Sequence, residues 1–371
     1  MITTINNKHN KLNVPNLRFP EFQGEWEKCT LEDVMNFSTT RVSSSELNED
    51  SYVSTENMLQ DFQGIVEAKS VPEEVNVISF SCGDILISNI RPYLKKVWRA
   101  TFNGGCSSDV FVLQANDNIE SDYLHYVVAN DKFINFVMSG AKGVKMPRGD
   151  KSQMKTYSLS LPQLQEQHKI ARLLSLLDER IATQNKIIDR LQSLIKGIAQ
   201  NIVRNNKPNI RLSDCLECSS SALQESDVCE YGTYPVYGAN GIVGYLDNYN
   251  TETEAVYIIK DGSGVGTVSY VTGKCSATGT LNTLQAKEGY SLQYLYYLLK
   301  VFNFEPYKTG MAIPHTYFKD YGKAKIFCPT YTKQLQYATL LSAIDKELLA
   351  EQRLLTNLCL QKQYLLRQMF I

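Results

Sequence analysis

Residues 161–203 read LPQLQEQHKIARLLSLLDERIATQNKIIDRLQSLIKGIAQNIV, and residues 328–370 read CPTYTKQLQYATLLSAIDKELLAEQRLLTNLCLQKQYLLRQMF. The two stretches align without a gap at an offset of 167 positions, which places Pro162 on Pro329. Because an internal repeat determines the architecture of a chain, it is interpreted first. A strand-rich segment precedes each copy, so the sequence predicts a mixed domain followed by a long helix, twice. A chain built from two similar halves also suggests that its ligand has two similar halves.

Each repeated stretch carries an apolar seam, in which steps of four and three residues alternate. Ten positions from Ile170 to Ile202 hold nine apolar side chains, and the ten equivalent positions from Tyr337 to Met369 hold eight. This spacing is typical of helices that pack lengthwise on another helix. The residues that we expect to form the helix–helix contact are Leu174, Leu177, Ile181, Ile188, Leu191, Leu341, Ile344, Leu348, Leu355 and Leu358.

The two predicted helices most simply pack on each other. A helix of about 40 residues is about 60 Å long at 1.5 Å per residue, and alone it would expose its seam to water. Gln184 and Glu351 interrupt the seam at the same repeat position, and a polar group there can fix the register of the pair. The seam predicts a spacer, although the periodicity alone also fits a coiled-coil stalk that dimerises two chains.

Composition places the chain among globular proteins. Of its 371 residues, 43% are hydrophobic and 21% are charged, and no apolar run approaches the ~20 residues of a membrane span. We therefore expect a cytoplasmic protein. The nine cysteines are scattered and odd in number, which argues against a disulfide framework and offers no zinc site. The net charge of −1 means that any anion-binding face must come from local clusters.

The sequence predicts an α+β fold, with two mixed α/β domains separated by the two long helices. Strand-like runs such as 84–90 and 255–260 precede a helical stretch in each domain, Tyr123–Val137 in the first and Leu292–Val301 in the second. We align 123–126 with 294–297 and Gly140 with Gly310, so the two domains are distant copies. The expected segments are a flexible N-terminus at 1–16, domains at 17–160 and 206–327, and helices at 161–205 and 328–371.

Basic residues gather in two places in the first domain. Lysine and arginine suit phosphate contacts because they replace the counterions condensed along a nucleic-acid backbone. For either cluster taken alone, an ordinary solvated charged loop is about as good an interpretation as a DNA-binding surface. The candidates for DNA contact in this domain are Arg91, Tyr93, Lys95, Lys96, Lys142, Lys145, Arg148 and Lys151.

The second domain offers a different set of polar side chains. Asparagine, lysine and hydroxyl groups can reach base edges and phosphates. His315 on its own is more often a packing or hydrogen-bonding residue than a functional one. The candidates for DNA contact in this domain are Tyr237, Asn240, Lys260, Ser263, Thr278, Thr280, His315, Tyr317 and Lys319.

The motifs of common nucleic-acid enzymes are missing from the sequence. The run DGSGVG at 261–266 precedes a strand-like segment instead of a helix, so we expect a hairpin loop and not a dinucleotide site. No GxxxxGK[ST] motif is present, and neither is the Asn-Pro-Pro-Tyr or Asp-Pro-Pro-Tyr run of amino-methyltransferases. Asp61, Glu67 and Lys69 only weakly resemble a nuclease metal site. We expect the chain to bind its ligand without catalysis and without a metal.

Two motifs, together with the tandem plan, carry a family resemblance. The run RFPEF-x-GEWE at 18–27 and the run LPQLQEQHKIARLLSLLDERI at 161–181 resemble the specificity subunit of type I restriction-modification systems. The resemblance covers the chain from about residue 15 onward. In the second copy, Lys333-Gln334 stands where the first has Glu166-Gln167, so the motif is weaker there.

The resemblance implies a DNA-binding subunit of a larger enzyme. Each mixed domain would be a target-recognition domain that reads one half of a bipartite DNA sequence. The two helices would pair as an antiparallel coiled coil that sets the gap between the halves. They would also dock two methyltransferase subunits, which hold S-adenosylmethionine. Restriction subunits would use ATP and Mg²⁺, and this chain would bind no cofactor. Two other interpretations stay open: a metal-dependent nuclease acting through Asp61, Glu67 and Lys69, and a coiled-coil scaffold without DNA readout.

Overall fold

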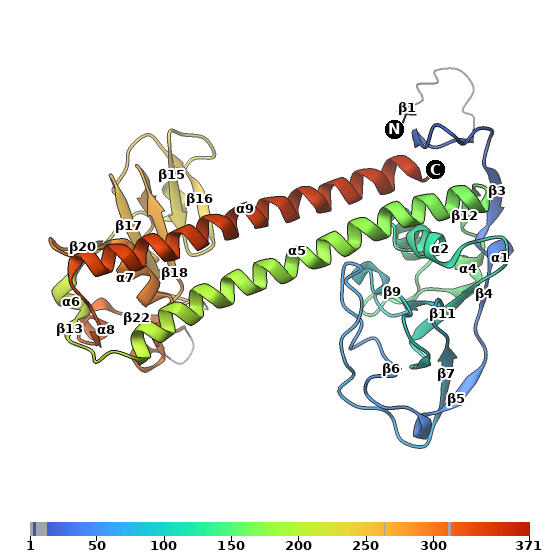
Figure 1. Ribbon diagram of the computed structural model, residues 1–371, viewed down its shortest axis with the longest axis horizontal. Coiled ribbons are helices and arrows are strands. Elements are labelled where there is room, and N and C mark those ends of the chain that lie inside the picture. The colour runs from blue at the N-terminus through green and yellow to red at the C-terminus, as the bar shows by residue number, and fades with distance from the viewer. Residues whose placement is uncertain (1–2, 5–12, 263, 311–312) are drawn as a thin grey trace. The chain divides into compact units, whose positions relative to one another are not determined.

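Two long helices dominate the computed structural model of the chain (Figure 1). They are α5, Leu164–Arg204, with 41 residues, and α9, Tyr331–Met369, with 39 residues. The repeated stretches therefore fold as the predicted helices. The residues that the structure describes are 3–4, 13–262, 264–310 and 313–371.

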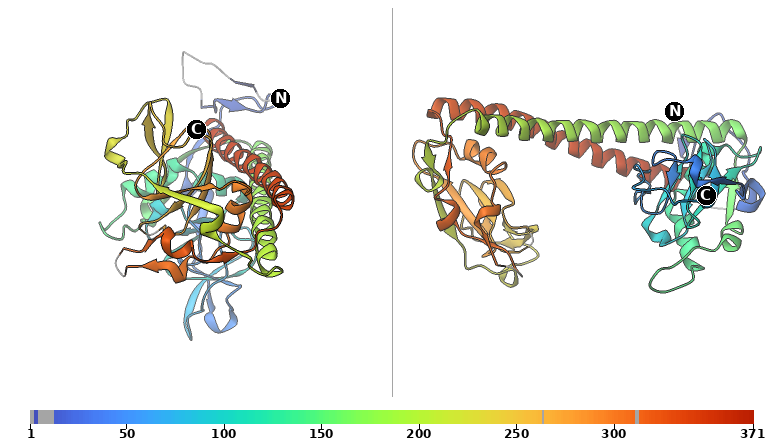
Figure 2. Two further views of the ribbon diagram at one scale, coloured as in Figure 1. Left: turned by 90° about the vertical axis from the view of Figure 1, so that its left-hand side faces the viewer. Right: turned by 90° about the horizontal axis from the view of Figure 1, so that it is seen from below.

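The chain forms two compact units, and each long helix contributes to both. The first unit spans 1–183 and 356–371, and the second spans 184–355. Early residues of α5 thus share a unit with late residues of α9, and late residues of α5 share one with early residues of α9. The two helices are antiparallel (Figures 1 and 2), which confirms the expected coiled coil.

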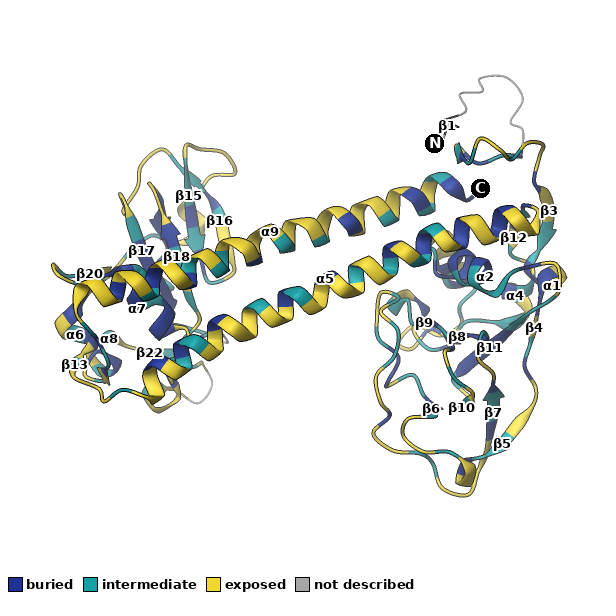
Figure 3. Ribbon diagram, in the orientation of Figure 1, coloured by how far each residue is buried: buried dark blue, intermediate teal, exposed yellow. Residues whose placement is uncertain are grey.

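The predicted seam is covered along its whole length, by the partner helix or by the core of a domain. All twenty seam positions of the two repeats are buried or half-buried (Figure 3). In the second unit, Ile188 and Ile195 share an apolar cluster with Leu341 and Leu348. In the first unit, Leu174 and Leu177 share the domain core with residues of α9 that include Leu358.

The first domain contains two four-stranded sheets, in the orders β4-β11-β8-β9 and β5-β7-β10-β6. All neighbours in the first sheet are antiparallel, whereas β10 and β6 in the second are parallel. Two short pairs, β1-β2 and β3-β12, complete the domain. The strands are β1 (Thr3–Thr4), β2 (Leu17–Arg18), β3 (Glu27–Thr30), β4 (Met35–Phe37), β5 (Arg41–Ser43), β6 (Tyr52–Val53), β7 (Asn76–Phe80), β8 (Ile85–Ser88), β9 (Val97–Arg99), β10 (Gly104–Cys106), β11 (Val110–Ala115) and β12 (Ser158–Leu161).

Short helices cover this domain, and they depart from prediction at one point. The stretch 123–137, expected as one helix, is two helices, because the Asn130 side chain accepts a hydrogen bond from the Lys132 amide (3.0 Å) and begins a new helix there. The short helix Leu31–Val34 begins with a capping box formed by Thr30 and Asp33. The helices are α1 (Leu31–Val34), α2 (Ser121–Val128), α3 (Asp131–Ser139), α4 (Lys151–Lys155) and the 3₁₀ turns η1 (Ser44–Glu46) and η2 (Pro92–Leu94).

The second domain repeats this plan. Its main sheet has the order β14-β20-β17-β18, again antiparallel throughout, and β23 pairs with β13 as β12 pairs with β3. The second sheet is reduced to β16-β15-β19. The strands are β13 (Ile210–Arg211), β14 (Leu216–Ser220), β15 (Tyr234–Gly238), β16 (Gly241–Leu246), β17 (Glu254–Ile259), β18 (Val268–Thr272), β19 (Ser276–Ala277), β20 (Leu281–Ala286), β21 (Lys308–Thr309), β22 (His315–Thr316) and β23 (Lys325–Ile326).

Predicted strands in both domains are present within one or two residues of their expected ends. The predicted helix 292–301 is α7, shortened to Leu292–Leu299. Most of the predicted N-terminal segment 1–16 lies outside the described residues; in its described part, Asn13 is buried and its amide hydrogen-bonds to the Trp26 carbonyl (2.5 Å). The remaining helices are α6 (Leu212–Cys215), α8 (Phe318–Tyr321) and the 3₁₀ turns η3 (Glu225–Asp227) and η4 (Glu305–Tyr307).

Candidate nucleic-acid interface

In the first domain, a hairpin loop is fixed to the end of strand β8. The loop is closed by two backbone hydrogen bonds between Lys142 and Arg148 (3.0 and 2.9 Å). The Arg91 amide, beyond the strand end, donates to the carbonyl of Pro147 in the loop (2.7 Å). The Gly149 amide in turn donates to the carbonyl of Asn89 (2.9 Å). The loop is therefore held on both sides of Arg148.

The second domain has the same backbone arrangement. Thr309 pairs with His315 in β21-β22, as Lys142 pairs with Arg148. The Gly262 amide donates to the Pro314 carbonyl (3.0 Å), and the Thr316 amide donates to the Lys260 carbonyl (2.9 Å). Each loop residue here lies 167 positions after its counterpart, so the gap-free repeat extends upstream from the helices into these loops.

The loop geometry corrects one alignment made from the sequence. Gly310 corresponds to Gly143 and not to Gly140, since 310 − 143 = 167. Both glycines adopt positive φ (94° at Gly143, 89° at Gly310), whereas Gly140 has φ −113°. A left-handed residue is thus required at the same point of both loops.

The basic side chains of the loop in the first domain differ in whether they form ion pairs. Arg148 pairs with Asp109 (2.8 Å) and Lys142 pairs with Asp150 (2.8 Å), both near the surface. Lys145 is exposed, and within the described part of the chain it has no ion pair. The structure thus brings Lys142, Lys145 and Arg148 together on one loop.

Lys151, just after this loop, has an aromatic environment. Its ammonium lies 4.7 Å from the ring centre of Phe111 and 5.0 Å from that of Phe37. Burial lowers the pKa of the Lys151 ammonium. The Lys151 ammonium therefore packs against two aromatic rings beside the loop and does not extend freely into solvent.

The other basic cluster of the first domain surrounds η2. Arg91 and Lys95 flank this turn with positive φ (50° and 53°), and Arg91 and Tyr93 are exposed. Lys95 pairs with Asp131 (2.9 Å). The Lys96 ammonium donates to the Thr55 carbonyl (2.5 Å), and burial lowers its pKa. Arg91 is the member that the structure joins to the loop, through its bond to Pro147.

In the second domain, four of the candidates gather around β22. His315 Nδ1 lies 2.7 Å from an oxygen of Asp261, and its ring stacks on Tyr317 with ring centres 6.3 Å apart. The Lys319 ammonium lies 5.2 Å from the Tyr317 ring centre. Lys260, whose carbonyl holds Thr316, directs its ammonium to the Ser220 hydroxyl (3.5 Å).

Of the remaining candidates of this domain, half-buried Thr280 adjoins this group, because its carbonyl accepts a hydrogen bond from the Lys260 amide (3.0 Å). Thr278 is buried and its hydroxyl pairs with that of Thr280 (2.8 Å). Tyr237 packs its ring against Tyr257, with ring centres 5.8 Å apart. Asn240 is exposed in the turn between β15 and β16. The candidate Ser263 lies outside the described residues.

Sequence reasoning missed the acids Asp109 and Asp261 and the apolar residues Met146 and Ile313. The two acids orient Arg148 and His315, and both apolar side chains are exposed on the loops. Extending the 167-residue offset upstream of Leu161 would have found the loops, because glycine, proline and a basic residue repeat there in register.

A repeated glutamine joins each long helix to its domain. The Gln167 side chain accepts a hydrogen bond from the Glu120 amide (2.8 Å) and donates to the Pro162 carbonyl (2.9 Å). Gln334 makes the same pair of bonds, with the Ser291 amide and the Pro329 carbonyl (both 2.9 Å). Both glutamines are almost fully buried, so each anchors the start of its helix.

A repeated tyrosine–aspartate hydrogen bond is the second attachment between each domain and its long helix. The Tyr126 hydroxyl donates to Asp178 (2.9 Å), and the Tyr297 hydroxyl donates to Asp345 (2.7 Å). Burial raises the pKa of both tyrosines far above 10, and the carboxylates add to the effect. Both hydroxyls therefore stay protonated and remain donors.

Among the described residues, an ion pair lies beside the glutamine anchor in the first unit alone. Buried Glu166 accepts hydrogen bonds from Arg18 (2.7 and 2.8 Å) and from the Trp26 indole (3.2 Å). This contact joins the two sequence motifs that carried the resemblance. In the second unit the equivalent residue is Lys333, which is exposed.

Comparison with known proteins assigns the family. The pattern of the type I restriction modification DNA specificity domain matches residues 23–193 and 206–357, most of the chain. The chain belongs to this family. The membership confirms the resemblance seen in the sequence, and it agrees with the expectation that the chain carries specificity and not catalysis.

Relatives of this DNA specificity family resemble the chain in sequence and in fold. The EcoDI specificity subunit of Escherichia coli is 28% identical over 124 residues, which are 33% of this chain and 28% of that protein. The chain thus matches well under two thirds of that relative's length. The S subunit structure from M. genitalium has a TM-score of 0.68 at 18% identity, covering 96% of this chain and 99% of the other. A structure titled for type I R-M complex assembly and conformational transition has a TM-score of 0.53 at 17% identity, covering 92% and 96%.

Within the described residues, no three His, Cys, Asp or Glu side chains are grouped as ligands for a metal ion. No described helix combines the length and the apolar character needed to cross a membrane.

Proposed function

We propose that the chain is the non-catalytic specificity subunit of a cytoplasmic type I restriction-modification complex and reads a bipartite duplex target with its two domains. The observation that carries this proposal is the pair of equivalent loops at the ends of β8 and β17. Their backbones match, but Arg148 with Asp109 stands in one loop where His315 with Asp261 stands in the other. One frame with different side chains suits the reading of two different half-sites.

The cations at these loops support a DNA ligand. Segment 140–150 carries Lys142, Lys145 and Arg148 against the single acid Asp150. Such clusters supply the sequence-independent contacts to phosphate, and neighbouring groups then read base edges. Because phosphate contacts release counterions, affinity for DNA should fall steeply with salt.

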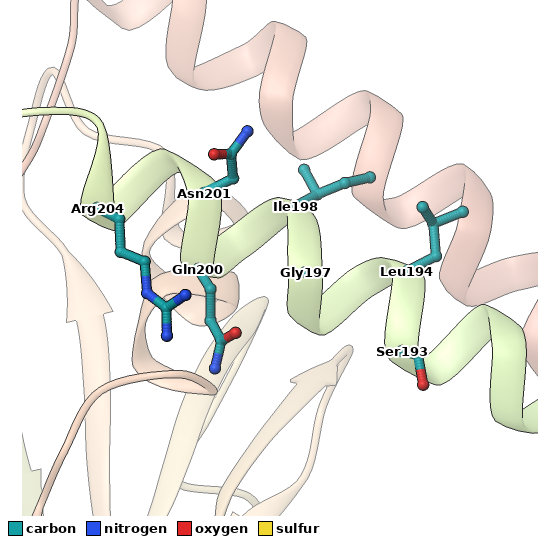
Figure 4. A pocket seen from close by; sticks show the side chains of 7 residues that line it. All are labelled: Ser193, Leu194, Gly197, Ile198, Gln200, Asn201 and Arg204. Carbon is teal, nitrogen blue, oxygen red and sulfur yellow. The ribbon is translucent and has the colours of Figure 1, made fainter.

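The long helices suit the docking of partner subunits. Apolar side chains remain exposed on their outer surfaces, away from the seam, and a shallow hollow lies on α5 around Gly197 (Figure 4). We propose that two methyltransferase subunits with S-adenosylmethionine, and restriction subunits with ATP and Mg²⁺, assemble here. The exposed residues are Leu164, Leu176, Leu194, Val203, Tyr331, Leu335, Leu340, Leu349, Leu354, Leu360 and Tyr364.

Selection from random duplexes tests the proposal. The full chain with its methyltransferase partner should enrich two short sequences at a fixed gap. Arg148→Ala should weaken binding and reduce the slope of log affinity against log salt by about 1 if the guanidinium contacts a phosphate. Lys28→Ala, which removes an exposed lysine of β3 remote in sequence from both clusters, is the control and should leave the affinity and the slope unchanged.

Two results would contradict this function. A complex that binds all duplexes alike would leave only the scaffold interpretation. Metal-dependent cleavage by the purified chain, abolished by Glu67→Ala, would instead favour a nuclease. Asp61, Glu67 and Lys69 are all exposed, and no contact in the described structure draws them together.

A further inference from the structure

The two loops share a six-residue pattern: glycine, two variable residues, an apolar residue, proline and a basic residue. It reads GVKMPR at 143–148 and GMAIPH at 310–315. At Gly143 an added Cβ would come 3.3 Å from the Met146 carbonyl oxygen, and at Gly310 it would come closer still to that of Ile313. Glycine thus lets the loop turn tightly over the carbonyl of its own apolar residue.

Each loop exposes the apolar side chain that precedes its proline. Met146 is 45% exposed and Ile313 is 59% exposed. In the first loop, Val144 is fully exposed as well. Single exposed apolar residues are ordinary on protein surfaces. Here, however, the exposure recurs at one loop position in two domains whose other loops differ in length and sequence, so chance exposure explains it poorly.

The backbone that carries each apolar side chain is held in place by the contacts of neighbouring residues. The following prolines accept the hydrogen bonds from Arg91 and Gly262, which fix the loop to the strand end. The next residues, Arg148 and His315, are oriented by Asp109 and Asp261. A loop backbone held in this way loses little conformational freedom on binding.

Basic residues neighbour both apolar tips in the sequence. Lys142, Lys145 and Arg148 lie within four residues of Met146, and His315 and Lys319 follow Ile313 within six residues. A ligand that contacts an apolar tip together with these basic side chains presents both apolar and anionic surface. Duplex DNA has this chemistry, because stacked bases lie between two lines of phosphates.

We propose that Met146 and Ile313 are apolar wedges, each entering a groove of one half-site and partly unstacking a base step there. The inference rests on the proposed DNA-reading function and adds to it the role of residues without any polar group. The neighbouring cations hold the phosphates on either side of the deformed step. Unstacking costs a few kcal/mol, so easily deformed steps, such as pyrimidine–purine steps, would be preferred at the point of insertion.

The test uses the full chain with its methyltransferase partner on the selected duplex. 2-Aminopurine is placed singly along each half-site, away from adenines that the partner methylates, and its fluorescence reports unstacking. Wild type should brighten one step in each half-site. Met146→Ala should remove the signal in one half-site, and Ile313→Ala in the other. Each should lower specific affinity about tenfold, about 1.4 kcal/mol, with non-specific affinity unchanged.

Matched variants separate a wedge from other roles. Met146→Leu keeps the apolar bulk and should retain the signal and the affinity. Val66→Ala removes a 50%-exposed apolar side chain of the same domain and should change neither.

Three results would overturn the inference. If both alanine variants bind and unstack as wild type does, the wedges are refuted while the proposed function stands. If they instead impair assembly with the methyltransferase in the absence of DNA, measured by size-exclusion chromatography, the tips contact protein. If wild type selects no sequence, the proposed function fails and the inference fails with it.

Discussion

At the residue scale, one buried position distinguishes the two domains: it holds a histidine in the first and a tyrosine in the second. His125 in α2 and Tyr296 in α7 occupy equivalent positions, each just before the tyrosine that bonds to a helix aspartate. Nδ1 of His125 is buried and has no partner among the described residues. Burial, helped by the charges of Lys362 and Arg99 and opposed by Asp178, lowers the pKa of His125 to about 4.

This histidine should make the first unit sensitive to acid. A folded pKa near 4, below the ordinary value of 6.5, means that the unfolded chain binds a proton first as pH falls. The stability is intact above pH 6.5 and is lost progressively towards pH 4. We expect a loss on the order of 2 kcal/mol, discounted because part of the residue touches solvent.

Replacing His125 with the tyrosine of the second domain checks this expectation. His125→Tyr should flatten the pH dependence of urea unfolding between pH 6.5 and 4. The control is His168→Gln, which removes an exposed histidine. Equal pH profiles for His125→Tyr and wild type would contradict the assignment.

At the scale of elements, the helices were predictable and the binding loops were only partly so. The seam is a local pattern, and tertiary packing agreed with it at every position from Ile170 to Ile202. Lys151 and Thr278 were chosen by residue type, but Phe37 and Phe111, remote in sequence from Lys151, determine its environment. Burial of Thr278 likewise depends on strands that its own neighbours do not reveal.

The same scale shows how the helices keep their register. Gln184 and Glu351 occupy the same repeat position, and their side chains hydrogen-bond to each other. The carboxamide also reaches the Glu351 carbonyl (3.3 Å). A shift of one helix by a turn would leave both polar groups against apolar neighbours, so this contact favours one alignment.

Adjacent leucines of α9 test the seam. Leu341 is fully buried in the helix–helix cluster, whereas its neighbour Leu340 is 51% exposed. Leu341→Ala should lower the free energy of unfolding of the second unit by about 2–5 kcal/mol, through lost burial and a cavity. Leu340→Ala should change it by under about 0.5 kcal/mol in the isolated chain. Urea unfolding followed by circular dichroism measures both, and similar losses would refute the seam packing.

At the scale of the whole molecule, the chain repeats a domain and a helix, and each helix enters both units. Any change in helix length must therefore be made in both helices if the seam is to stay paired. A heptad is the smallest insertion that preserves the seam pattern, since the steps of three and four then resume in phase.

Paired heptad insertions test whether the helices set the gap between half-sites. Seven residues added after Gln184 and seven after Glu351 lengthen each helix by about 10 Å at 1.5 Å per residue. Because base pairs rise by about 3.4 Å, the selected gap should grow by up to about three base pairs. Both half-site sequences should stay the same, since neither domain is altered. Inserting the heptad in α5 alone is the control, and it should lower stability and broaden the selected gaps because the seam loses its partner. A gap that stays at its original length after the paired insertion, with both half-sites still selected, would mean that the spacing is set by something other than the helices.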